Sequence, residues 1–170
     1  MFWTFTLPAL FLLSFAAWRD VATRTIPNAA CGALAALGLA LRATEGWYAL
    51  GVSVAAAVPV FLVLLLCHAR GLLGGGDVKL LTALTLGLPP MGSWNLVVAT
   101  ALAGGVLALA YLVLQRLPTK CLTLPVRAGN NTLHRVLAVE SWRIRRRGPM
   151  PYGVAIAIGA VIVLLQAQEG

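Results

Sequence analysis

Two acidic residues in this chain are placed where they could act together. Asp20 follows an uncharged apolar run, and Asp77 follows three glycines between two long apolar segments. A carboxylate at membrane depth loses its hydration, so an ionisable residue in such a place is a functional hypothesis by default. Two carboxylates that approach closely share one proton, so that one activates a water and the other donates to a substrate carbonyl. Asp20 and Asp77 are therefore candidates for a catalytic pair that titrates as one unit.

The other acids of the chain suggest less. The chain has only five Asp and Glu residues in all. We expect Glu45 in an external turn, Glu169 in the external tail and Glu140 in a basic region, where it would form a local ion pair. An alternative reading of the two aspartates stays open. Arg19 and Lys79 flank them, and acids at helix ends often form interfacial ion pairs or caps.

Gly74, Gly75 and Gly76 precede Asp77 directly and are candidates for an active-site loop. A protease that used such an acid pair would bind its substrate extended, so that one backbone must approach another. Three residues without side chains permit that approach. The alternative reading is a flexible linker at the start of a helix.

Other side chains that could take part in chemistry are less well placed. His68 is a lone histidine near the predicted cytoplasmic face. Lys79 lies two residues after Asp77 and would point away from it on a helix, toward the interface. Cys31, Cys67 and Cys121 form no C-x-x-C pair, which disfavours metal ligation and a disulfide framework. We expect the cysteines to serve as small packing residues, and we expect no metal and no cofactor.

Composition places these residues in a membrane protein. The chain has 170 residues, of which 60% are hydrophobic and 11% are charged, and its mean hydropathy is +0.89. Soluble domains carry about 25% charged residues. The sequence therefore predicts an all-α fold made of a single polytopic membrane domain, residues 1–170, without a large soluble domain.

Six apolar segments are candidates for membrane helices, with Pro59 as a tolerated kink in the third. They cover residues 3–18, 29–43, 47–67, 77–88, 94–115 and 152–166. The fourth would be about 18 Å long at 1.5 Å per residue, against about 30 Å of hydrocarbon. Either Asp77 lies inside the near interface, or the helix continues through Pro89 and Pro90 and leaves Asp77 at the surface.

The basic residues predict the orientation of these segments. The formal net charge is +8, and every Lys and Arg except Arg42 falls in an odd-numbered loop. The positive-inside rule then makes these loops cytoplasmic and both termini external. The basic loop at 116–149, in which 133–144 has the pattern of an interfacial helix, would contact anionic lipid headgroups. No nucleic acid is needed to explain the charge.

Three sequence elements together resemble a known family. Gly74-Gly75-Gly76-Asp77 is similar to the G-x-G-D motif of polytopic aspartyl proteases, in the version found in the type IV prepilin peptidases. Asp20 with Ile26-Pro27-Asn28 resembles the first catalytic aspartate of that family. Residues Pro151-Tyr152-Gly153-Val154-Ala155 resemble its Pro-Tyr-Gly-x-Ala element. The elements occur in the family's order, and each begins or ends a predicted span.

The resemblance implies an aspartic endopeptidase of the bacterial inner membrane. It would cleave the leader from type IV prepilin or pseudopilin precursors at the cytoplasmic face, with Asp20 and Asp77 as the catalytic pair. The candidate supporting residues are Lys79, Asn28, Pro27, Tyr152 and Gly153. The inserted C-x-x-C region of larger members is missing here, so neither zinc nor N-methyltransferase activity is expected. The size resembles the short TadV/CpaA-type peptidases of Flp pilus (tight adherence) systems.

Two functions of other classes remain open at this point. A small transporter or channel would use Asp77 as a proton relay, and a pilus assembly factor would keep the scaffold without catalysis. The sequence does not specify the particular prepilin, its cleavage-site preference or the oligomeric state.

Overall fold

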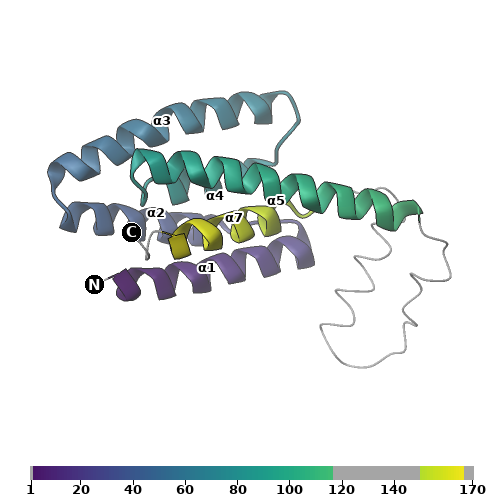
Figure 1. The fold of residues 1–170 in the computed structure, drawn as a ribbon, viewed down its shortest axis with the longest axis horizontal. Coiled ribbons are helices and arrows are strands. Elements are labelled where there is room, and N and C mark those ends of the chain that lie inside the picture. The colour runs from purple at the N-terminus through teal and green to yellow at the C-terminus, as the bar shows by residue number, and fades with distance from the viewer. Residues whose placement is uncertain (1, 117–149, 167–170) are drawn as a thin grey trace.

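The protein, described here from a computed structural model, is a bundle of helices (Figure 1). The structure describes residues 2–116 and 150–166, and the described residues contain six α-helices and no strand. The helices are α1 (Phe2–Thr23), α2 (Asn28–Thr44), α3 (Trp47–Ala69), α4 (Gly75–Thr85), α5 (Pro90–Arg116) and α7 (Tyr152–Gln166). The all-α prediction is confirmed for this part of the chain.

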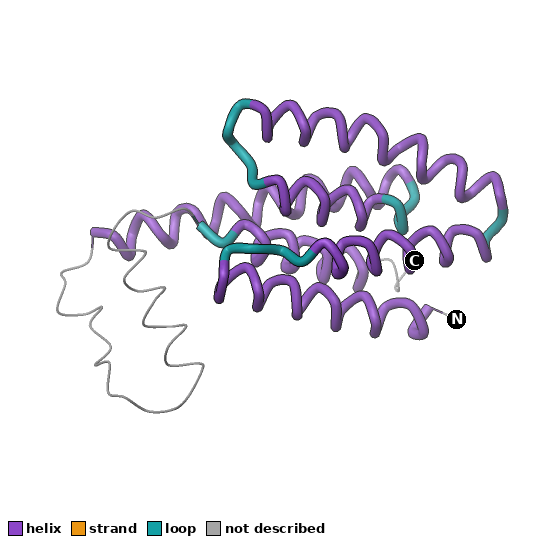
Figure 2. Tube along the Cα trace, turned by 180° about the vertical axis from the view of Figure 1, so that it is seen from behind, coloured by secondary structure: helices purple, strands orange, loops and turns teal. Residues whose placement is uncertain are grey.

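The helices run up and down, and short connections join α1 through α5 in order (Figure 2). The start of α1 and the end of α7 lie at the same end of the bundle (Figure 1). The end of α1 and the starts of α2, α4 and α7 therefore lie at the opposite end. This second end, called the aspartate end below, carries Asp20 and Asp77.

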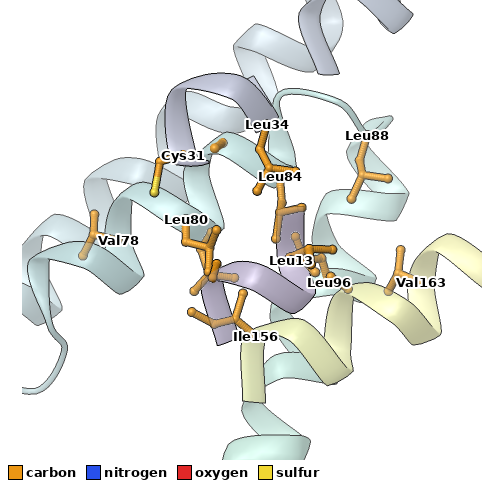
Figure 3. Close-up of a cluster of buried hydrophobic side chains, with 14 of the residues drawn as sticks. Leu13, Cys31, Leu34, Val78, Leu80, Leu84, Leu88, Leu96, Ile156 and Val163 are labelled. Atoms are coloured by element: carbon orange, nitrogen blue, oxygen red, sulfur yellow. The ribbon is translucent and has the colours of Figure 1, made fainter. Parts of the chain in front are cut away.

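Helix α4 lies at the centre of the bundle, where it contacts α2, α3, α5 and α7. Its buried side chains point in several directions around the helix, as expected when a short apolar helix is surrounded by others. They are Val78, Leu80, Leu81, Ala83, Leu84 and Thr85. Leu13 of α1, Leu96 of α5 and Ile156 of α7 complete the core around them (Figure 3). The N-terminus of α4 is thereby fixed by the core.

Several helix boundaries differ from the sequence prediction, most of all those of α1 and α5, whereas α4 spans Gly75–Thr85 in place of 77–88. We expected the first helix to end at Trp18, but α1 continues to Thr23, so Asp20 lies in its last turn rather than in a loop. The helix stops at Arg24, whose φ of 56° is left-handed. The fifth helix begins at Pro90 rather than at Trp94, because proline is well tolerated in the first turn of a helix.

Length and composition support a membrane location for two of the described helices. Only α3 and α5 among them are long and apolar enough to cross a membrane, whereas α2 and α7 are shorter apolar helices. Six membrane spans therefore stay a prediction. The predicted basic loop at 116–149, apart from Arg116, lies outside the described residues, and so does its predicted interfacial helix at 133–144.

Helices α5 and α7 approach each other closely at Gly159. A Cβ atom added to Gly159 would lie 2.7 Å from the backbone nitrogen of Thr100. Gly159→Ala is therefore expected to lower the free energy of unfolding by about 1–3 kcal/mol, the usual cost of overpacking. Thermal unfolding in detergent measures this change. Gly51→Ala in α3 is the matched control, because a Cβ there meets nothing within 4 Å, and equal Tm values for the two variants would contradict the packing.

Candidate functional site

Asp77 lies in the first turn of α4, at the aspartate end of the bundle. Its Oδ2 accepts a hydrogen bond of 3.2 Å from the backbone N–H of Gly74. The N-terminus of a helix also favours a negative charge through its dipole. A Cβ atom on Gly74 would lie 2.8 Å from the same oxygen. Gly74 therefore allows the loop to close over the carboxylate of Asp77.

Asp20 is buried at the end of α1, with only 7% of its surface exposed. Its Oδ2 accepts a 2.9 Å hydrogen bond from the backbone N–H of Gly153, the second residue of α7. A Cβ atom on Gly153 would lie 2.8 Å from this oxygen and 3.1 Å from the carboxyl carbon. The N-terminus of α7 thus holds Asp20 in the way that the start of α4 holds Asp77.

The two carboxylates lie close enough for the negative charge of Asp20 to act on Asp77. The charge of Asp77 also acts on Tyr152, which directly precedes Gly153. Three elements that are far apart in the sequence, α1, α4 and α7, therefore meet at one place. Two carboxylates that approach closely can share a proton, so that one can take a proton from water while the other donates one.

Gly75 and Gly76 were predicted to lie in a loop, but they form the first turn of α4, and only Gly74 precedes the helix. Both pack against the protein itself. A Cβ atom on Gly76 would lie 3.2 Å from the Cβ of Ile26, and one on Gly75 would lie 3.4 Å from the imidazole of His68. The absence of side chains at these two positions therefore lets the start of α4 approach Ile26 and His68.

Two of the candidate supporting residues contact each other. Lys79 Nζ donates a 3.0 Å hydrogen bond to Asn28 Oδ1, which joins α4 to the start of α2. Pro27 precedes α2 in an extended conformation, with ψ of 132°. The expectation that Lys79 turns away from Asp77 fits this contact, and Asn28 is the partner that sequence reasoning did not identify.

The Lys79–Asn28 contact is expected to stabilise the fold slightly. Both side chains are exposed, so Lys79→Met and Asn28→Ala should each lower the free energy of unfolding by about 1 kcal/mol. The double variant should lose less than the sum of the two, with a coupling of at least about 0.5 kcal/mol. The measurement is a double-mutant cycle: unfolding in detergent of the wild type, the two single variants and the double variant. Strictly additive losses of stability would show that the contact contributes nothing.

Tyr152 is positioned by a glycine in a neighbouring helix. The side chain is half-buried at the start of α7, and a Cβ atom on Gly104 of α5 would lie 3.0 Å from its ring. The neighbouring Gly105 makes no such contact, because a Cβ atom there would meet nothing within 4 Å. Gly104 therefore leaves room for the ring of Tyr152 against α5.

Other candidate groups lie outside this arrangement. His68 is exposed, and its Nδ1 lies 2.8 Å from the carbonyl oxygen of Leu73, so the imidazole holds the loop before Gly74. Cys31 is buried and Cys67 is half-buried, both as free thiols, and Cys121 lies outside the described residues. Within residues 2–116 and 150–166, no three His, Cys, Asp or Glu side chains form a cluster that could hold a metal ion.

The fold and the site together define an all-helical protein with two carboxylates held at one end of its bundle. The type IV leader peptidase family matches residues 7–112, more than half of the chain, and the chain belongs to that family. The match includes both aspartates and the three glycines, whereas the Pro-Tyr-Gly element at 151–153 lies outside it. No match was found among curated proteins or among solved structures. Membership of this family identifies the protein as a peptidase of the type IV leader peptidase kind.

Proposed function

We propose that this protein is a membrane aspartic endopeptidase that removes the leader peptide from Flp-type prepilins or pseudopilins. The observation that carries the proposal is the meeting of two carboxylates at the aspartate end. Each accepts a backbone N–H from a helix N-terminus or the residue before it, Gly74 for Asp77 and Gly153 for Asp20. Family membership supplies the class of substrate, and the Flp-type systems are the narrower part of the proposal.

The chemistry follows from one proton shared by the two carboxylates. The unprotonated carboxylate takes a proton from a water molecule, whose oxygen then attacks the scissile carbonyl carbon. The protonated carboxyl donates its proton to the carbonyl oxygen as the tetrahedral intermediate forms. The intermediate collapses when the carbon–nitrogen bond breaks. The carboxyl that took the proton of water gives it to the departing nitrogen, and the other carboxylate takes a proton from a hydroxyl of the intermediate as the product carboxylic acid forms, so that the pair again holds one proton. No cofactor is needed for this cycle.

The held geometry of the carboxylates supports this cycle. Hydrogen bonds from Gly74 and Gly153 fix one oxygen of each group. Prepositioned groups lower a barrier because the ordering cost is met during folding. Asp20 is also buried, with 7% of its surface exposed, which restricts the movement of its side chain.

Orientation in the membrane is part of the proposal. We place the aspartate end at the cytoplasmic face of the inner membrane, with both termini external and six membrane spans. The start of α1 and the end of α7 lie at one end of the bundle (Figure 1), as an even number of spans requires. The distribution of basic residues sets the direction.

Cleavage by the purified protein tests the proposal. The full chain is reconstituted in liposomes with an Flp-type prepilin, and mass spectrometry identifies the new N-terminus. We expect one cut, at the junction of leader and mature pilin, and no cut in the same pilin made without its leader. Proton flux across the liposomes without cleavage would favour a transporter. If the protein restores pili in a strain while the prepilin stays uncleaved, the result would favour an assembly factor.

The depth of Asp77 can be measured by thiol labelling. In a chain whose native cysteines are replaced, Asp77→Cys is expected to react more slowly with a membrane-impermeant thiol reagent than Leu72→Cys, because residue 77 is half-buried and Leu72 is 73% exposed. Both positions lie at the aspartate end, so the comparison controls for access to that face. Equal labelling rates would place residue 77 at the membrane surface.

A further inference from the structure

A cavity of about 350 Å³ lies inside the bundle, away from the two aspartates. Helices α1, α2, α4, α5 and α7 all contribute to its wall, which includes Leu34, Leu37 and Arg42 of α2. Asn28 lies at the aspartate end, and Arg42 lies about 20 Å farther along α2, at 1.5 Å per residue. The cavity therefore belongs to the opposite half of the bundle and is separate from the proposed peptidase site.

The short length of α4 explains the position of the cavity. This helix has 11 residues, whereas α3 has 23 and α5 has 27. The last turn of α4 and the residues after it, among them Leu84 and Leu88, form one wall of the cavity. Gly87 and Pro89, between α4 and α5, belong to the same wall. The wall is mostly apolar, and an apolar cavity excludes water.

One end of the cavity carries a positive and a negative side chain together. Arg42 is 8% exposed, and its Nε donates a 2.7 Å hydrogen bond to Ser53 Oγ. Its Nη1 forms an ion pair with Glu45, and its Nη2 lies 3.4 Å from the carbonyl oxygen of Ala49. The Glu45 side chain is 38% exposed. Arg42 and Glu45 both line the cavity.

We propose that this cavity binds a phospholipid with a zwitterionic headgroup that contains a primary ammonium. One acyl chain would fill the apolar part, with its phosphate at Arg42 and its ammonium at Glu45. Guanidinium groups bind phosphate through parallel N–H donors. The described residues occupy three of the five N–H donors that an arginine has. We assign the phosphate to the other two, for which no partner is seen among the described residues.

The charges at this end select between headgroups. The ion pair of Arg42 and Glu45 has no net charge, so a headgroup with one negative and one positive group matches it. An anionic headgroup would meet the carboxylate of Glu45 without a cation of its own to offset it. This lipid site therefore differs from the anionic lipid contact predicted for the basic loop.

Lipid retained by the purified protein tests the proposal. The full chain is placed in nanodiscs of equal parts phosphatidylethanolamine and phosphatidylglycerol, transferred to mild detergent and examined by native mass spectrometry. We expect phosphatidylethanolamine to be retained on the protein over phosphatidylglycerol. Leu37→Trp, which fills the cavity, should reduce retention by at least about tenfold. Leu62→Trp is the matched control, because Leu62 is 57% exposed on α3 and is not part of the cavity wall.

A second variant tests the headgroup contact without filling the cavity. Glu45→Gln removes the anion beside Arg42 at a partly exposed position, so the preference should change from phosphatidylethanolamine to phosphatidylglycerol. The proposal is overturned if wild type retains the two lipids in their bulk ratio, if Leu37→Trp retains as much as Leu62→Trp, or if Glu45→Gln keeps the original preference. None of these readouts depends on peptidase activity, so the proposal stands or fails independently of the proposed function.

Discussion

Asp77→Asn is expected to lower the rate of leader cleavage by about 10²- to 10⁴-fold, the usual contribution of general acid–base catalysis. The amide cannot take a proton from water, whereas its shape stays close to that of the carboxylate. Asp20→Asn should cause a loss of the same order, because the proposed chemistry uses both groups. The rate is measured in liposomes with a prepilin substrate, at matched amounts of protein in the membrane.

Thermal unfolding separates chemistry from folding in these variants. Both asparagines can still accept the N–H of Gly74 or Gly153 through their side-chain oxygen, so we expect Tm values close to that of wild type. An Asp77→Asn protein that processes prepilin at the wild-type rate would exclude Asp77 from catalysis. The same result for Asp20→Asn would exclude the pair.

Gly153→Ala is expected to reduce cleavage by about a hundredfold, although the residue carries no functional side chain. The new methyl group would lie 2.8 Å from Oδ2 of Asp20, so either the carboxylate or the start of α7 must move. A displacement of about 1 Å at a catalytic group can cost about 10²-fold in rate. We expect the loss in kcat rather than in KM, because the substrate need not contact Gly153.

Gly105→Ala provides the matched control for this prediction. It makes the same chemical change in the interior of α5, where a Cβ atom meets nothing within 4 Å. Its cleavage rate should equal that of wild type, and its stability should be unchanged or slightly higher, since alanine favours a helix over glycine. Equal kcat values for Gly153→Ala and Gly105→Ala would show that Gly153 does not position Asp20.

The helices were largely predictable because apolar runs and prolines mark them. Pro27 and Pro59 behave as expected from local chemistry, and the last helix has the predicted bounds, Tyr152–Gln166. The Pro89-Pro90 pair lies between two helices as expected, but Pro90 is already the first residue of α5. The end of α1 was not predictable in this way. Between Trp18 and Thr23 the sequence becomes polar while the helix continues, because polar residues at a helix end do not by themselves stop it.

The pairing of Asp20 with Asp77 could be inferred because the chain has so few acids. Their hydrogen-bond partners were harder to predict. The contact between Asp77 and Gly74 is local and is typical of a helix start. The contact between Asp20 and Gly153 joins residues 133 positions apart, and no local pattern indicates such a partner; the Pro-Tyr-Gly element was the one available signal.

The Arg42 site shows a different limit of sequence reasoning. From the sequence, Arg42 was only a basic residue near the opposite face of the membrane. Its burial and its hydrogen bond to Ser53 depend on how α2 packs against α3. The cavity beside it depends on the early end of α4. Both follow from three-dimensional packing, which charge patterns along the chain do not specify.

The measurement that tests the catalytic pair most directly is the cleavage rate of the Asp20→Asn/Asp77→Asn double variant, compared with the two single variants. Residues that act as one unit give strongly non-additive losses. If the two carboxylates share one proton and one reaction, the double variant will keep the same residual rate as either single variant. A double variant whose loss equals the product of the two single losses would show that Asp20 and Asp77 act separately, and would contradict the pair.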